Sequence, residues 1–408
     1  MTRSVIESPT TSALRLPTET TRKSPAGAQV IRVVTTFEEF LELEQTWNRV
    51  LAQADISHPF LEHSWVRTWL ECFGQNSLLR IVVVNSGSET VAIAPLILTH
   101  IRMWGIPARQ LGLPYNDHVP RADFIVARGY EDAYEAILNY LRRSREWDVI
   151  QLCQLPADSE TLAQLLARAP EQNCRTGLWV SGASPCVALE SQWMEYYEGL
   201  PAKHKSNLRN RFKRLGQLGP VEMETVTQEG QVPDALAQGL ELEAAAWKRG
   251  EGTAITCDRD ITRFYATFAQ RAANLGWLRL NFLRAGSDRI AFDYSLSYRN
   301  QIFLLKLGYN PEFSAYSPSN LLLSLALQDA FGRGYSRYDF LGDQADWKKC
   351  WTKASAAQVW LFLFPNTFKG RLLHLVKFQL IPMLRRHSPG SLRALVVRAK
   401  ARLSERSR

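Results

Sequence analysis

Residues 278–331 constrain the fold of this chain more than any other segment. Three consecutive runs, at 278–283, 290–298 and 302–309, have the apolar or alternating pattern of β-strands. The segment that follows at 320–331 has the length of a helix and is apolar nearly all round, so it must be buried between a sheet and other elements. This order predicts a strand meander and an internal helix whose N-terminus lies where α/β sheets form ligand crevices.

The same order of elements occurs twice along the chain. In the first half, strands are expected at 30–35, 79–85, 91–99, 122–127, 147–152 and 186–189, and helices at 37–54, 60–70, 131–143 and 159–169. In the second half, the meander and its helix are joined by strands at 221–226, 336–341 and 358–364 and by helices at 234–248 and 261–275. Residue identity between the halves is low, so the duplication is one of element order. We predict an α/β fold of two tandem domains, 29–190 and 191–365, each with a mixed central sheet flanked by helices.

Composition limits the class of protein. A chain of 408 residues with 46% hydrophobic residues is long enough for two or three packed domains. Residues 1–28 mix Ser, Thr, Pro and charges without an apolar core, which predicts a disordered leader and excludes a signal peptide. The six cysteines form no Cys-x-x-Cys pair and the seven histidines do not cluster, so we expect reduced cytosolic thiols and no metal site. No run reaches the ~18 apolar residues of a membrane-spanning helix.

The C-terminal tail, residues 366–408, carries most of the net charge. It holds eleven Lys and Arg against one Glu, a local charge of +10 in a chain of net charge +9. Apolar residues at helical spacing form one face (Phe368, Leu372, Leu375, Val376, Leu380, Met383) and, after a Ser-Pro-Gly break, a second (Leu392, Leu395, Val396, Ala399, Leu403). A basic amphipathic helix favours an anionic membrane surface. Packing back on the core is the alternative.

The turn before the internal helix is the main candidate binding site. Ser317, Ser319 and Asn320 are N-cap residue types, and Pro318 suits a first helical turn. A helix N-terminus has unpaired N–H groups and a partial positive charge, which together favour phosphate. The alternative is that these residues only cap a buried helix.

Several short motifs resemble a known family. They are Glu-Ala-Ala-Ala-Trp-Lys at 243–248, Gly-Thr-Ala-Ile at 252–255, Gly-Trp-Leu-Arg-Leu at 276–280, Ile-Ala-Phe at 290–292, Leu-Gly-Tyr-Asn-Pro-Glu-Phe-Ser-Ala-Tyr-Ser-Pro at 307–318, Leu-Leu at 321–322, Gly-Tyr-Ser-Arg-Tyr-Asp-Phe-Leu-Gly at 334–342 and Trp-Lys-Lys-Cys-Trp at 347–351. Together they resemble the GNAT-related acyltransferases typified by the cellulose-biosynthesis (CelD or BcsL) family, which are related to FemAB-type transferases. The resemblance covers about residues 30–364 and is densest after 200. Where the family usually has Ser-Pro-Gly, this chain has Ser319 in place of the glycine.

The resemblance implies two GNAT-like domains and acyl transfer from acetyl-CoA or another acyl-CoA. The acceptor would be an amine or hydroxyl of a sugar-linked or polar molecule in exopolysaccharide or cell-envelope biosynthesis. We therefore expect a cytoplasmic transferase that is peripheral to the inner membrane.

Acyl transfer requires a base for the acceptor and donors for the oxyanion. Asp293 is a base candidate because it is a lone carboxylate in a strand, although a solvated edge would also explain it. Asp339 could act as a base or hold Lys348, or it could be a structural cap or ion pair. Tyr309 could protonate the departing thiolate.

The remaining candidates concern binding of the donor. Lys306 interrupts an apolar strand and could meet phosphate or the oxyanion, or extend its ammonium into water. Tyr316, Ser317, Ser319 and Asn320 complete the expected acyl-CoA site.

Two polar groups receive a structural interpretation. Glu243 is interpreted as a solvated charge beside a core Trp at position 247, and His118 as part of an ordinary polar turn that could also touch an acceptor.

Two other functions stay open. The first is a FemAB-like transferase that uses aminoacyl-tRNA, since residues 200–215 hold six Lys and Arg and no acid. Binding of nucleic acid is disfavoured because Phe212 is the one aromatic residue there. The second is a catalytically silent adaptor that recruits a polysaccharide synthase to the membrane.

Overall fold

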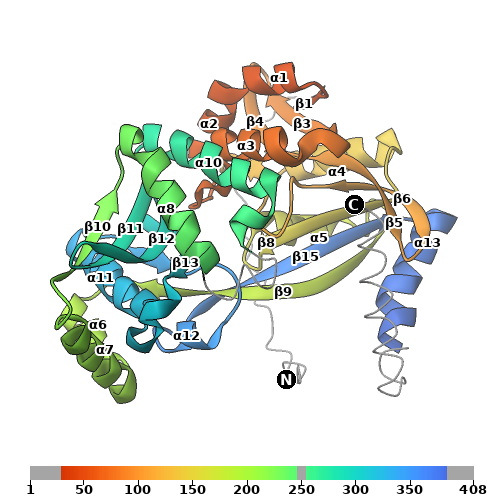
Figure 1. Cartoon of the computed structure of the whole chain (residues 1–408). Helices are drawn as coiled ribbons and strands as arrows, with labels where there is room; N and C mark the ends of the chain where they lie inside the picture. The colour runs from red at the N-terminus through yellow and green to blue at the C-terminus, as the bar shows by residue number, and fades with distance from the viewer. Residues whose placement is uncertain (1–28, 246–253, 384–408) are drawn as a thin grey trace.

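The computed structural model describes residues 29–245 and 254–383 (Figure 1). The predicted leader at 1–28, the last three residues of the helix predicted at 234–248 and the second amphipathic face of the tail lie outside these residues. No helix within the described ranges is long and apolar enough to cross a membrane.

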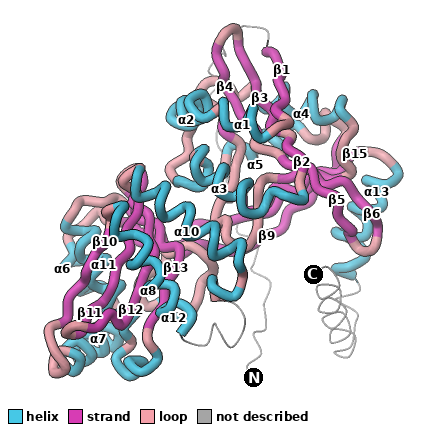
Figure 2. Tube along the Cα trace, turned by 45° about the horizontal axis from the view of Figure 1, so that its top comes forward, coloured by secondary structure: helices cyan, strands magenta, loops and turns pink. Residues whose placement is uncertain are grey.

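The chain forms two sheets. The smaller has the strand order β1-β3-β4-β7, and the larger has the order β10-β11-β12-β13-β14-β9-β15-β8-β6-β5-β2. The larger sheet runs through the whole molecule, and helices of both halves pack on it (Figures 1 and 2). The predicted α/β fold with mixed sheets is confirmed.

The first half begins with β1 and two short helices, and α3 then leads into the strands. Its strands are β1 (Gln29–Val34), β2 (Leu78–Leu79), β3 (Ile81–Ser86), β4 (Glu89–Ala94), β5 (Ile97–Met103), β6 (Ile106–Gly112), β7 (Ile125–Val126), β8 (Val149–Pro156) and β9 (Cys174–Ala188). Its helices are α1 (Phe37–Glu42), α2 (Glu44–Gln53), α3 (His63–Phe73), α4 (Ala133–Ser144) and α5 (Glu160–Arg168), with 3-10 turns η1 (Pro59–Leu61) and η2 (Gly74–Asn76). Thr36 and Glu39 form a capping box that starts α1.

The second half repeats this order after two connecting helices. Its strands are β10 (Val221–Val226), β11 (Leu278–Ala285), β12 (Asp288–Tyr298), β13 (Gln301–Tyr309), β14 (Arg337–Asp339) and β15 (Ser355–Pro365). Its helices are α6 (Trp193–Gly199), α7 (Ala202–Leu215), α8 (Val232–Ala245), α10 (Arg259–Asn274), α11 (Pro318–Gly332), α12 (Asp346–Lys349) and α13 (Phe368–Leu375), with η3 (Glu229–Gln231), η4 (Ile255–Cys257), η5 (Pro311–Tyr316) and the π-helical turn η6 (Val376–Leu380).

The two halves exchange strands at the centre of the large sheet. Strand β9, the last of the first half, lies between β14 and β15, and β15, the last of the second half, lies between β9 and β8. Outward from this centre, both directions show an antiparallel pair and then a parallel pair, β14 with β13 and β8 with β6. The pairing is therefore symmetric about the β9–β15 contact, and each half completes the other's sheet.

Helix α11 is buried as its composition predicts. Leu321, Leu322, Leu323 and Leu327 are fully inaccessible and pack against the sheet. Helices α8 and α10 cover the opposite face, where Phe282, Phe292 and Phe303 contribute to the main core. Strands β11 to β13 thus lie between two helical layers. Because both faces of these strands are covered, their sequences are hydrophobic almost continuously.

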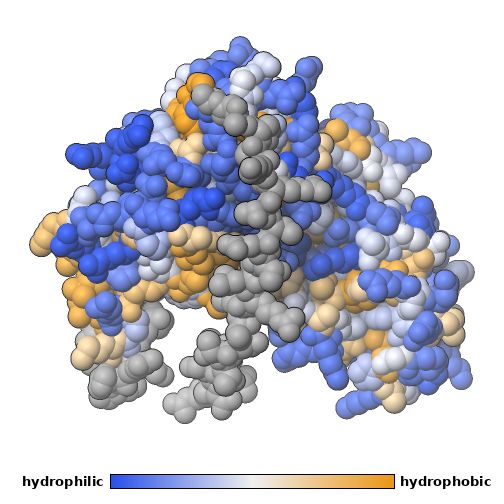
Figure 3. Space-filling model, turned by 180° about the vertical axis from the view of Figure 1, so that it is seen from behind, coloured by the Kyte–Doolittle hydropathy of each residue, from blue (hydrophilic) through white to orange (hydrophobic). Residues whose placement is uncertain are grey.

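The start of the tail packs back on the large sheet. Leu373 of α13 is fully buried, His374 Nε2 lies 3.2 Å from the Thr176 carbonyl, and Phe378 packs on Phe362. The predicted apolar face points away from this contact, since Phe368 is 85% exposed and Met383 is 60% exposed. Apolar residues are visible on the flank that carries α13 when the molecule is seen from behind (Figure 3).

Candidate active site

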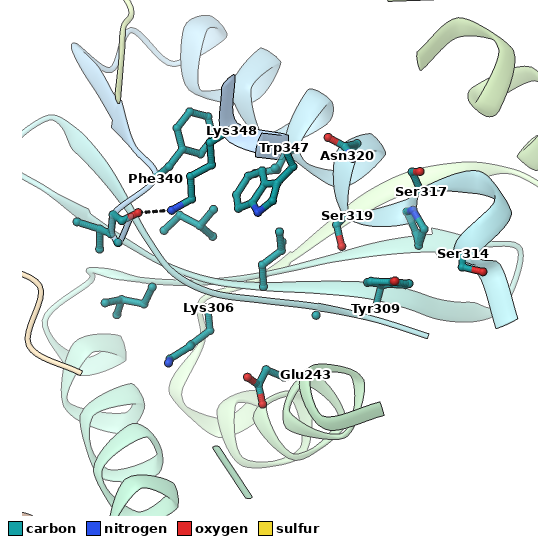
Figure 4. Close-up of a pocket in the computed structure, with 18 residues that line it drawn as sticks. Glu243, Lys306, Tyr309, Ser314, Ser317, Ser319, Asn320, Phe340, Trp347 and Lys348 are labelled. Atoms are coloured by element: carbon teal, nitrogen blue, oxygen red, sulfur yellow. Dashed lines mark hydrogen bonds between the residues drawn. The ribbon is translucent and has the colours of Figure 1, made fainter. Parts of the chain in front are cut away.

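A cleft opens where β13 and β14 separate. The two strands pair only over Gln301–Phe303 and Arg337–Asp339, and the chain beyond these residues lines a cavity of about 470 Å³. One wall is residues 304–309, and the other includes Phe340, Leu341 and Gly342. The N-terminus of α11 closes one end (Figure 4).

The first turn of α11 faces this cleft. Ser317 adopts a left-handed conformation with φ of 48°, which turns the chain from η5 into the helix, and Pro318 occupies the first helical position. Asn320 is oriented by Trp351, whose Nε1 donates to its Oδ1 at 3.3 Å. The Ser319 side chain points toward β13 across the cleft (Figure 4). Because α11 has no acidic residue in its first turn, the partial positive charge of its N-terminus is not neutralised there.

A β-bulge places the Lys306 side chain on the face of β13 opposite to α11. Tyr294 of β12 pairs with Lys306 while Ser295 pairs with Leu304, so Leu305 is the extra residue. The shift turns Lys306 toward α8 and α10, and it lies across β13 from Ser319 (Figure 4). Lys306 lines the cleft.

His118 of the first half contacts Lys306. Its Nδ1 lies 3.3 Å from Lys306 Nζ and 3.1 Å from Tyr265 Oη. Lys306 Nζ also lies 5.2 Å from the centre of the Tyr265 ring. Burial, and then the Lys306 charge, lower the pKa of His118 to about 4, so its imidazole is neutral at pH 7. The sequence favoured an ordinary polar turn over contact with an acceptor, and the structure shows that this turn contacts Lys306, a residue that lines the second half's cleft.

Glu243 is the residue that the sequence interpretation placed wrongly. It is 2% exposed and lines the cleft, where its carboxylate accepts a hydrogen bond from the Ile255 N–H at 3.1 Å. The reason is Gly308, because a Cβ there would lie 2.4 Å from the Glu243 Cα. The absent side chain lets α8 pack directly on β13. A glycine within an apolar strand was the available signal for this close approach.

Lys348 and Asp339 do not form an ion pair, so the option that Asp339 holds Lys348 is not the one observed. Lys348 Nζ donates to the carbonyls of Leu341 and Asp343, the latter at 3.0 Å, and holds the turn after β14. Burial lowers the pKa of Lys348 to about 8. Lys348 does line the cleft.

Asp339 is fully buried and does not line the cleft, although it immediately precedes the wall residues Phe340 and Leu341. Its Oδ2 is 2.5 Å from Arg121 Nη2 and 3.4 Å from Arg337 Nη2, and its Oδ1 accepts from the Leu341 N–H at 2.9 Å. The structural alternative for Asp339, an ion pair, is the one observed. The pair joins the two halves, because Arg121 precedes β7.

Asp293 is fully buried, and a solvated edge is therefore the wrong explanation for it. Its Oδ1 accepts hydrogen bonds from Asn281 and Ser295, each at 2.8 Å, and burial raises its pKa to about 7. It does not line the cleft.

Of the two candidate tyrosines, Tyr309 and Tyr316, one lines the cleft and the other does not. Tyr309 lines the cleft at the end of β13. Tyr316 does not, and its ring lies under the Arg214 guanidinium of α7, at 5.1 Å. The cleft thus gathers Lys306, Tyr309, Ser317, Ser319, Asn320 and Lys348 of the predicted set and adds Glu243. Among the described residues no group of His, Cys, Asp or Glu could hold a metal ion.

Comparison with known proteins agrees with this geometry. Residues 202–349 match the model of the acetyltransferase (GNAT) domain. The crystal structure of FemX superposes with a TM-score of 0.56 and 12% identity over 82% of this chain and 98% of that one. A protein of unknown function from Bacteroides thetaiotaomicron VPI-5482 gives 0.52 and 12% over 82% of this chain and 100% of that one. A search of curated proteins finds no match. Residues 202–349 therefore form a GNAT-type acetyltransferase domain, and over 82% of its length the chain is similar in fold to FemX.

Proposed function

We propose that the protein transfers an acyl group from acyl-CoA, with acetyl-CoA as the expected donor, to an amine or hydroxyl of a polar acceptor. One observation carries the proposal: within the segment that matches the GNAT domain, a cleft between two diverging strands ends at the acid-free first turn of α11. That turn suits the pyrophosphate of CoA, and the cleft suits its thioester arm.

In this scheme the donor binds on one face of β13 and the acceptor reacts on the other. Ser317, Ser319 and Asn320 bind the donor on the α11 side. On the α8 side, Glu243 takes the proton of the acceptor as its nitrogen or oxygen attacks the thioester carbonyl. The C–S bond then breaks, and Tyr309 protonates the departing thiolate. Lys306, held by His118 and Tyr265, stabilises the oxyanion. Asp293 and Asp339 act structurally in this scheme because neither lines the cleft.

The acceptor is proposed from the resemblance in the sequence. Cellulose-type acetyltransferases imply a sugar-linked acceptor in exopolysaccharide or envelope biosynthesis. The polar acceptor side formed by Glu243 and Lys306, with His118 in contact with Lys306, is consistent with a hydroxyl or amine nucleophile.

Thermal unfolding tests the donor. Acetyl-CoA should raise the melting temperature, because a ligand that binds the folded state stabilises it by about 2.7 kcal/mol at 100 times its Kd. Ser319→Phe should remove this shift in melting temperature by filling the cleft. Ser319→Gly should increase the shift. Ser191→Phe, at an exposed position outside the cleft, is the matched control. An absence of any shift with every acyl-CoA tested would refute the proposal.

Aminoacyl-tRNA is the alternative donor. Helix α7 exposes Arg209, Lys213 and Arg214, and Arg214 stacks on Tyr316 beside the N-terminus of α11. The same melting experiment with tRNA in place of acetyl-CoA separates the two donors. A protein stabilised by neither would fit the adaptor hypothesis.

We also propose that the tail contacts an anionic membrane. Phe368, Leu375, Leu380 and Met383 are exposed on one side of α13 and η6, in a segment rich in Lys and Arg. Co-sedimentation with phosphatidylglycerol vesicles should fall when Phe368 and Met383 are replaced by Ser, and phosphatidylcholine vesicles are the control. Equal binding to both vesicles would contradict this assignment.

A further inference from the structure

A second hollow lies beside the donor end of the cleft, between α7 and η5. Its volume is about 530 Å³, and Ala315 is the residue of η5 that lines it. Ser314 and Ser317, on either side of Ala315 in the sequence, line the cleft (Figure 4). The hollow and the cleft therefore adjoin each other across η5. The other residues that line the hollow belong to α7 or follow it: Asn207, Asn210, Arg211, Lys213, Arg214 and Gln217.

The side chains that α7 contributes to this hollow can all donate hydrogen bonds. Two are guanidinium groups and one is an ammonium group, and the remaining three are amides. No carboxylate lines the hollow. Among the residues that the structure describes, Arg211, Lys213 and Arg214 have no ion-pair partner. The hollow therefore combines positive charge with hydrogen-bond donors, which is the chemistry that recognises a phosphate group.

Two sets of contacts fix α7 against the first turn of α11. The Arg214 guanidinium lies over the ring of Tyr316, at 5.1 Å, and Tyr316 directly precedes Ser317. His204, also on α7, packs edge-on against Trp351 with 4.5 Å between the ring centres, and Trp351 orients Asn320. Helix α7 accordingly contacts both η5 and α11 (Figure 1). The positive charges of α7 are thus held in a defined position beside the proposed donor site.

The donor carries phosphate in two places, and the cleft suits only one of them. The pyrophosphate of CoA suits the first turn of α11. The 3′-phosphate lies one ribose away, and as a monoester it carries about −1.5 to −2 charges at pH 7. The two lysines of the cleft are engaged elsewhere, Lys306 with His118 and Lys348 with the carbonyls of the turn after β14. The nearest set of cations with no ion-pair partner, on the side of η5, is that of α7.

We propose that the hollow between α7 and η5 binds the 3′-phosphate of the CoA donor, and that Arg211 and Arg214 determine specificity for it. The guanidinium groups donate to the phosphate oxygens, and Lys213 adds charge at the edge. The inference rests on the proposed acyl-CoA donor and adds to it a preference for the phosphorylated ribose.

Calorimetric titration of the full chain with two matched ligands tests the proposal. Acetyl-CoA and acetyl-3′-dephospho-CoA differ in this one phosphate. The parent should bind acetyl-CoA about tenfold more tightly or better, as expected for hydrogen bonds between charged groups. Arg211→Gln together with Arg214→Gln should bring the ratio of the two Kd values close to one. Arg214→Gln alone, at an exposed position, should lower the ratio part of the way.

The ratio of the two Kd values separates specificity from general damage. A change in the first turn of α11 would weaken both ligands equally, and the ratio would stay that of the parent. Arg209→Gln is the matched control, because Arg209 is exposed on the same helix and does not line the hollow. This variant removes the same charge from α7 and should keep the parent ratio.

Failure of this inference can be told from failure of the proposed function. If the parent binds both ligands equally, the hollow does not read the 3′-phosphate, and the acyl-CoA donor still stands. The inference is also overturned if the double variant keeps the parent ratio, or if Arg209→Gln lowers the ratio as much as the double variant does. If neither ligand binds, the acyl-CoA donor is refuted and this inference falls with it. Binding of tRNA by a parent that does not distinguish the two ligands would assign the hollow to tRNA phosphates instead.

Discussion

The ion pair between Arg121 and Asp339 should make a measurable contribution to stability. Asp339 is fully buried and Arg121 is 9% exposed at the side chain, with 2.5 Å between Nη2 and Oδ2. Replacing Arg121 with Met keeps the apolar stem that packs in the wall and removes the guanidinium. The variant therefore leaves a buried carboxylate with one charged partner fewer.

The expected loss follows from the partners that remain. Removing one member of a buried pair typically costs about 3–5 kcal/mol, because the other charge is left uncompensated. Arg337 stays at 3.4 Å with a side chain 34% exposed, and the Leu341 N–H still donates at 2.9 Å. We therefore expect a loss near the lower limit, about 3 kcal/mol. The double variant Arg121→Met, Asp339→Asn leaves no buried carboxylate at this position. Its loss in free energy of unfolding should therefore be smaller than the sum of the losses in the two single variants.

Urea unfolding, followed by tryptophan fluorescence, measures these free energies. Arg128→Met is the matched control, since its pair with Asp55 is 3.3 Å long but 68% and 94% exposed. Exposed pairs contribute about 0–1 kcal/mol. If Arg121→Met costs no more than Arg128→Met, or if the two single losses add in the double variant, the coupling inferred here is wrong.

Two further predictions concern the packing around the cleft. Gly308→Ala should destabilise the fold by about 1–3 kcal/mol and reduce the response to acetyl-CoA, because the new Cβ would push on the backbone of Glu243. Gly332→Ala, where no atom lies within 4 Å, should be neutral or slightly stabilising in the same melting experiment, and an equal loss in both variants would contradict the packing argument. Burial raises the pKa of Asp293 from 3.8 to about 7. Between these two pH values the folded state keeps the proton on Asp293, whereas the unfolded state releases it. Asp293 therefore lowers the free energy of unfolding as pH rises from about 4 to 7. Asp293→Asn should remove up to about 4 kcal/mol of that fall, whereas urea midpoints that depend on pH as in the parent would refute the buried acid.

The main elements of the second half could be predicted from sequence, for a local reason. Strands β11 to β13 are covered on both faces and helix α11 is apolar nearly all round, so their patterns depend little on partners. Strand β9 was predicted at 186–189 but spans Cys174–Ala188. Gly177, Gly182 and Pro185 weaken its strand signal. Gly177 lies under Phe378 of η6, where a Cβ would be 2.2 Å from the ring, so tertiary packing explains its presence.

The site was predictable only in its local part. The turn at Ser317–Asn320 and the lysine in β13 are visible as residue types in a pattern. The contacts of His118 with Lys306 and of Arg121 with Asp339 join residues 188 and 218 positions apart, and no local pattern encodes them. The orientation of Lys306 depends on a bulge, and that of Glu243 on a glycine in a different element.

The strand exchange explains how two copies of one fold could take different roles without separating. Strand β9 completes the sheet beside β14, and β15 completes the sheet beside β8, so neither half has a full sheet without the other. The two halves must therefore stay together while the residues at their cleft positions change. The first turn of α11 has no acidic residue, whereas Glu131 and Asp132 precede α4 and Glu135 lies in the first turn of α4. The Arg121–Asp339 ion pair joins the two halves at this point, so it contributes to keeping them together while the residues around it change.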